Sequence, residues 1–110
     1  MLEKDFLNML REMEEEEHRI MSVKGMEYTA GDLVEDRLAN FYRISEELDI
    51  DPKLVLYVYL KKHLDSICCY IKQNKEYSEE SIESRIHDAR NYLVLLNGII
   101  RQQKKDKNNV

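Results

Sequence analysis

Two stretches of the chain interrupt apolar helical patterns with side chains that can bind metals or phosphates. These side chains, from residues 54–71 and then from residues 78–100, are Lys62, His63, Asp65, Arg85, Asp88, Asn91 and Tyr92. Carboxylates on neighbouring helices can hold a divalent metal beside a bundle core. Mg²⁺ prefers oxygen ligands and often binds through a few carboxylates together with substrate phosphates. We therefore expect the two stretches to pack together as helices and to frame a polar site for a metal or a nucleotide.

The predicted Mg²⁺ ligands are Asp65 and Asp88, with Glu16 or Glu17 as a third ligand. Burying an ionised carboxylate is costly unless a cation pairs with it, so an inward acid near residue 16 would imply such a partner. The alternative is that the acidic run 14–17 is a solvated helix face. Aspartates on two helices are also common as ordinary surface or hydrogen-bonded residues, so this pair leaves both interpretations open.

Other side chains suit the remaining parts of a nucleotide. Lys24 and Lys62 can meet phosphate oxygens as point charges. Tyr28 can stack on a base, and Asn91 can read a base edge. A metal-bound water could then attack a phosphoryl group. His63 lies at the edge of an apolar stripe, where a hydrogen-bonded core histidine is the alternative to a ligand.

Four amphipathic helices are expected to position these groups. Apolar residues recur at helical spacing over residues 2–21, 33–48, 52–73 and 78–100. Asp51 is a good N-cap and Pro52 a good first helical residue, and the Ser78 hydroxyl can cap the last helix.

Between the first two helices, residues 22–32 contain two glycines and are predicted to break regular structure. These patterns predict an all-α fold, a compact bundle of about four helices. We expect a single helical domain over residues 1–103 and a flexible basic tail over residues 104–110.

Composition bounds the function. The chain has 110 residues and a formal net charge of −5, which argues against direct nucleic-acid binding. No apolar run approaches the ~20 residues of a membrane span, and the acidic N-terminus does not resemble a signal peptide. Cys68 and Cys69 are adjacent and are expected to be reduced thiols of a cytoplasmic protein. Apolar residues exceed what one small core can hold, so we expect a homo-oligomer.

Four motifs carry a resemblance to a known family. They read Lys24-Gly-Met-Glu27-Tyr28, Arg37-Leu-Ala-Asn40-Phe41, Lys62-His63-Leu-Asp65-Ser66-Ile67 and Glu80-Ser-Ile-Glu83-Ser-Arg85-Ile-His-Asp88-Ala-Arg-Asn91-Tyr92. The chain thereby resembles small phage and prophage proteins of the nucleotide-modification-associated domain 1 group, which is similar to all-α MazG-like nucleotide pyrophosphohydrolases.

The resemblance covers about residues 24–96 and implies a nucleotide-related function. It implies a nucleotide ligand held by Lys24, Glu27, Tyr28, Asn40, Lys62, His63, Arg85, Asn91 and Tyr92. The chain departs from the family at Glu27, where relatives carry aspartate, and at Asp65, where many carry a base. It also lacks the strict acidic helix signature of MazG-like enzymes. These departures concern the metal site more than the fold.

Three functional hypotheses follow. The first is a Mg²⁺-dependent (d)NTP pyrophosphohydrolase, with Asp65, Asp88 and Glu16 or Glu17 as metal ligands. The second is a non-catalytic binding module for a nucleotide, a nucleotide signal or a host protein, acting by inhibition or sequestration. The third is a helical oligomer in which Asp65 and Asp88 only form structural ion pairs. Turnover after Asp88→Ala separates the first from the others, and no catalytic residue is assigned.

Overall fold

The computed structural model describes residues 1–29, 36–76 and 79–108, and of residues 24–29 it describes the backbone. The regular structure of these residues is helical, which confirms the predicted all-α class. The helices are α1 (Glu3–Thr29), α2 (Ala39–Leu48), α3 (Pro52–Gln73) and α4 (Ile82–Asn108). The chain forms two compact units, Met1–Arg37 and Leu38–Val110. None of the described helices has the length and apolar character of a membrane span.

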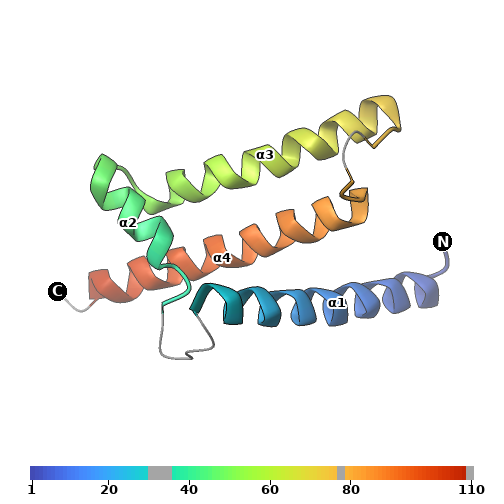
Figure 1. Ribbon diagram of the computed structural model, residues 1–110. Coiled ribbons are helices and arrows are strands. Elements are labelled where there is room, and N and C mark those ends of the chain that lie inside the picture. Colours follow the sequence, from blue (N-terminus) through green and yellow to red (C-terminus); the bar gives the residue numbers. More distant parts are fainter. Residues whose placement is uncertain (30–35, 77–78, 109–110) are drawn as a thin grey trace. The chain divides into compact units, whose positions relative to one another are not determined.

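The second unit is a small helical bundle. In Figure 1, α3 and α4 run antiparallel beside each other, and α2 packs against α3. Its buried apolar residues among those described are Phe41, Val55, Leu56, Leu60, Ala89 and Ile99. This core holds the two helices together, as the apolar periodicity predicted, and fixes the register between their polar side chains.

The α3 helix begins and ends where the sequence predicted. The Asp51 carboxylate accepts a hydrogen bond from the Lys53 backbone N–H at 2.9 Å, and Pro52 occupies the first helical position, where its missing N–H costs nothing. At the other end Asn74 adopts a left-handed conformation, and its N–H donates to the Tyr70 carbonyl. Asn is one of the few residues that tolerate this conformation well.

Two predictions about the first half of the chain are wrong. The α1 helix passes through Gly25 and continues to Thr29, although residues 22–32 were predicted to break it. A single glycine costs a helix only about 1 kcal/mol, and the Lys, Met and Glu residues around it are good helix formers. The α2 helix begins at Ala39 rather than near Leu33, after a turn at 37–38. Leu38 packs on the core from this turn, so apolar spacing continues beyond the helix.

The predicted ends of α4 are also wrong. Its first residue is Ile82, and the Ser81 hydroxyl accepts a hydrogen bond from the Ser84 N–H at 3.1 Å, as an N-cap does. Ser78 itself lies outside the described residues. At the other end the helix continues to Asn108, through most of the predicted tail. Gln, Lys and Arg are good helix formers, and basic residues in the last turn suit the helix dipole.

Candidate functional site

One flank of the α3–α4 pair carries a line of polar and aromatic side chains, which we call the seam. It consists of Tyr59, His63, Ser66, Arg85, Asp88 and Tyr92. On each helix these residues are three or four positions apart, and such residues share one helix face. Because the helices are antiparallel, Tyr59 meets Tyr92 at one end of the seam, and Ser66 approaches Arg85 at the other.

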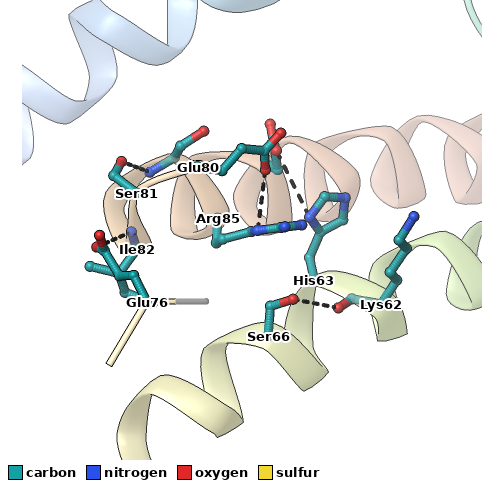
Figure 2. A network of polar contacts seen from close by, with 10 residues as sticks. Lys62, His63, Ser66, Glu76, Glu80, Ser81, Ile82 and Arg85 are labelled. Atoms are coloured by element: carbon teal, nitrogen blue, oxygen red, sulfur yellow. Dashed lines mark hydrogen bonds and ion pairs between the residues drawn. The ribbon is translucent and has the colours of Figure 1, made fainter. Parts of the chain in front are cut away.

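The middle of the seam is an acid–base pair. The Nδ1 atom of His63 lies 3.8 Å from Oδ2 of Asp88, and the two side chains are only 14% and 16% exposed. Figure 2 shows the His63 ring projecting from α3 toward α4, with the Arg85 side chain running toward it.

Aromatic rings line the end of the seam near the core. The rings of Tyr59 and Tyr92 are nearly parallel at 7°, with centroids 6.2 Å apart, and the His63 ring lies 5.2 Å from Tyr92. Phe41 of α2 meets Tyr59 edge-on at 5.9 Å. Since these contacts come from three helices, they hold the rings in fixed positions. The outermost ring, that of Tyr59, is exposed and offers a surface for stacking.

A pocket of about 240 Å³ adjoins the other end of the seam, beside the α3–α4 connection. Its lining residues are Ser66, Cys69, Tyr70, Lys75, Glu76, Glu80, Ile82 and Arg85. Arg85 binds the exposed carboxylate of Glu80, with Nε 3.1 Å from Oε2. Glu76 accepts a hydrogen bond from the Ile82 N–H at 2.8 Å and so satisfies a backbone donor at the start of α4. The pocket therefore contains two cations, and its acids already have structural partners.

The two predicted aspartate ligands have different partners. Asp65 is exposed and binds Lys61 one turn earlier at 2.5 Å, and this bond raises the pKa of Lys61. Asp88 instead pairs with His63 inside the seam. The described side chains include no group of three or more His, Cys, Asp or Glu residues placed to hold a metal ion. Metal binding by Asp65 and Asp88 therefore remains a prediction.

The other predicted metal ligands lie in α1. Glu16 accepts hydrogen bonds from the Arg19 guanidinium, the shorter at 2.6 Å, and this interaction raises the pKa of Arg19. Glu17 follows in the same helix. Both acids belong to the first unit, whereas Asp65 and Asp88 belong to the second, so metal binding by these acids together remains a prediction.

The remaining predicted nucleotide contacts are dispersed. Lys24, Glu27 and Tyr28 lie in the last turns of α1, and their side chains are outside the described part of the chain. Asn40 is an exposed residue in the first turn of α2, and Lys62 is exposed on α3. Asn91 is half-buried on α4 next to Tyr92.

The structure brings together four of the predicted site residues, His63, Arg85, Asp88 and Tyr92. Several other residues of the same site were not predicted. Ser66 and Tyr59 were missed as site residues, although their spacing from His63 places them on the same face. Lys75, Glu76 and Glu80, which line the pocket, were predicted to lie in a turn and at the start of a helix. Helical spacing from His63 could have identified the first two, whereas the pocket depends on how the connection folds.

Comparisons with family models, curated proteins and solved structures found no match to this chain. Support for a function therefore comes from the site itself and from the resemblance carried by the four sequence motifs.

Proposed function

We propose that the protein binds a nucleotide along the seam, with its phosphates at the pocket and its base at the tyrosines. The observation that carries this proposal is the position of Arg85, which lines the pocket and lies in the seam. A guanidinium binds phosphate oxygens through paired N–H donors. Lys75 adds a second positive charge at the pocket.

Binding requires Arg85 to exchange one anionic partner for another. Its Glu80 partner is 54% exposed, whereas the Arg85 side chain is only 18% exposed. A phosphate that replaced Glu80 would keep an anion beside this largely buried guanidinium, so the exchange would not leave the Arg85 charge unpaired. Glu80 would then turn into solvent, away from the incoming negative charge.

The length of the seam suits a nucleotide. Ser66 and Tyr59 are seven residues apart on α3, which corresponds to about 10 Å along the helix axis. A ligand with its phosphate at Arg85 can thus reach the exposed Tyr59 ring with its base. Between these ends the Asp88 carboxylate can accept hydrogen bonds from sugar hydroxyls.

The second candidate is the Mg²⁺-dependent pyrophosphohydrolase, and the half-buried Asp88 carboxylate favours it. Its oxygens are of the kind that Mg²⁺ prefers. However, Asp88 pairs with His63, and the described side chains include no group of three or more His, Cys, Asp or Glu residues placed to hold a metal ion, so the described residues of the second unit do not by themselves fit a magnesium site. We therefore derive no hydrolytic step, and Mg²⁺ remains a predicted cofactor.

The test is calorimetric titration with the standard ribo- and deoxyribonucleotides, with and without Mg²⁺, comparing wild type, Arg85→Gln and the control Arg101→Gln. Arg101 is an exposed residue of the same helix, outside the seam. A charged hydrogen bond contributes about 1.5–3 kcal/mol, so Arg85→Gln should weaken binding roughly 10- to 100-fold while Arg101→Gln has little effect. Equal effects of the two variants, or no binding by folded protein, would refute the proposal.

Product analysis of the same samples separates the two candidates. Release of pyrophosphate that disappears in Asp88→Asn would favour the hydrolase. Binding without product would favour the non-catalytic module, which would act by sequestering its nucleotide. Helix content from circular dichroism should be the same in all variants, so that lost binding is not confused with unfolding.

A further inference from the structure

The flank of α3 opposite the seam carries an exposed stripe of side chains that the proposed function does not use. We call it the α3 stripe, and it consists of Leu54, Tyr57, Lys61, Leu64, Cys68 and Ile71. The steps between its members are alternately three and four residues, which is the spacing of the contact positions in a coiled coil. Ile71 is 75% exposed and Leu54 is 55% exposed.

The α3 stripe and the seam occupy different sides of the helix. Each residue advances the direction of the side chain by about 100°, so the centre of the stripe lies roughly half a turn from His63 and Ser66. The stripe spans Leu54 to Ile71, about 26 Å along α3. A ligand in the seam and a partner on the stripe would therefore not compete for the same side chains.

We propose that the α3 stripe binds the same stripe of a second copy of this chain, in antiparallel orientation. A two-fold axis near the middle of the stripe places Leu54 opposite Ile71, Tyr57 opposite Cys68, and Lys61 opposite Leu64. Every member then meets another member, which is the self-complementarity that a two-fold interface requires. The proposal is independent of nucleotide binding.

The charges of Lys61 and Asp65 favour the antiparallel orientation of the two helices and a second copy of the chain as the partner of the stripe. Lys61 lies at the centre of the stripe and binds Asp65 at 2.5 Å within its own helix. In a parallel pair the two Lys61 side chains would face each other and repel. In the antiparallel pair each Lys61 comes within reach of Asp65 of the second copy, so the four charges alternate in sign. Each Lys61 would thus keep Asp65 of its own helix and gain Asp65 of the second copy, which lies beside the stripe.

The size of the stripe predicts a reversible dimer. A contact about 26 Å long and one helix wide, about 10 Å, covers roughly 260 Å² per copy. Stable interfaces bury about 800 Å² per partner. We therefore expect dissociation at micromolar concentrations, and the association must be measured over a range from about 1 to 300 µM.

The first test measures molar mass by sedimentation equilibrium over this range for wild type, Leu54→Lys/Ile71→Lys and the control Leu48→Lys. Leu48 is a large exposed residue at the end of α2 and is not a member of the stripe. Wild type and control should move from the 13.2 kDa monomer toward twice that mass, and the double variant should need at least 10-fold higher concentration. The new lysines would face each other across the dimer.

The second test locates the contact by disulfide cross-linking. In a Cys69→Ser background, Tyr57→Cys should form an intermolecular disulfide with Cys68 of the second copy on mild oxidation. The control Leu48→Cys in the same background should cross-link at least 10-fold more slowly. Equal rates for the two variants would overturn the antiparallel register.

Three outcomes of molar-mass and melting measurements on these variants would overturn the dimer. The wild type could remain monomeric at all concentrations, or the double variant could dimerise as well as the control. A double variant that melts at lower temperature with no change in mass would assign the stripe to residues 1–37 of the same chain, or to the core, rather than to a second copy.

Discussion

Asp51 lies where α2, α3 and α4 are joined, and its replacement tests how the fold is held there. Its Oδ1 atom accepts a hydrogen bond from the Lys53 N–H at 2.9 Å and another from the Gln103 side chain of α4 at 3.1 Å. Loss of an N-cap costs about 1 kcal/mol. The Gln103 bond is exposed, so water can replace it at little further cost. We therefore expect Asp51→Ala to lower the free energy of unfolding by about 1 kcal/mol.

The asparagine variant separates the cap from the charge. Asn caps a helix as well as Asp, so Asp51→Asn should lose only the exposed ion pair with Lys53, a few tenths of a kcal/mol. The Lys53 N–H bond, helped by Gln103, holds the pKa of Asp51 below its ordinary value against the smaller opposing effect of desolvation. This charge-dependent contribution is complete above the unfolded pKa of about 3.9 and is lost as pH falls through the lower folded pKa. The gap between wild type and Asp51→Asn should therefore narrow below about pH 4.

Thermal unfolding followed by circular dichroism at pH 7 measures these differences. A loss of 1 kcal/mol corresponds to a fall in Tm of about 4–8 °C for a domain of this size. Asp106→Ala, which removes an exposed carboxylate near the end of α4, is a matched control and should change Tm little. An Asp51→Ala variant as stable as wild type, or an Asp51→Asn variant as unstable as Asp51→Ala, would refute the capping argument.

Three further predictions concern the core, a turn and the site. Leu56 is 0% exposed, so Leu56→Ala should lower the free energy of unfolding, measured in urea, by about 2–5 kcal/mol. Val58 is 69% exposed, so Val58→Ala should change this free energy by less than about 0.5 kcal/mol. Similar losses for both variants would contradict the assigned core. Asp49 ends α2 in a left-handed conformation with φ 54°, so Asp49→Gly should stabilise by up to about 1 kcal/mol, and destabilisation would argue against that conformation. Tyr92→Leu removes the ring that stacks on Tyr59 and should weaken nucleotide binding at least about 5-fold with unchanged helix content; unchanged affinity would exclude the seam as the site of the base.

Helix ends were predictable where the sequence contains a strong local signal. Asp51-Pro52 located the start of α3 to the residue, because both the cap and the proline are favoured at those positions only. The ends of α1 and α4 were not predictable in this way. For polar residues such as those after Ile100, the helical and non-helical conformations have similar free energies. Whether the helix continues depends on propensity differences of less than about 1 kcal/mol per residue.

Side-chain neighbours along one helix were predictable, and neighbours across helices were predictable only in part. The packing of α3 against α4 was predicted, whereas the pairing of His63 with Asp88 was not. Spacing alone could not decide on which flank Asp65 lies, because a residue beside an apolar stripe can turn toward either edge. Its ion pair with Lys61 leaves it on the exposed side. The contact of Tyr59 with Tyr92 depends on the register between two helices, which only the packed core sets.

The small core gives the proposed dimer a role in stability. The residues described in the second unit include six buried apolar side chains, of which Leu56 and Ile99 are fully buried, while α3 alone exposes Leu54, Tyr57, Val58, Leu64 and Ile71. A domain of this size is marginal unless more of its apolar surface is removed from water. Association through the α3 stripe would bury part of that surface without covering the seam on the other flank. Because a partner that binds only the folded chain raises the apparent stability by mass action, the Tm of wild type should rise with protein concentration, and that of Leu54→Lys/Ile71→Lys should not.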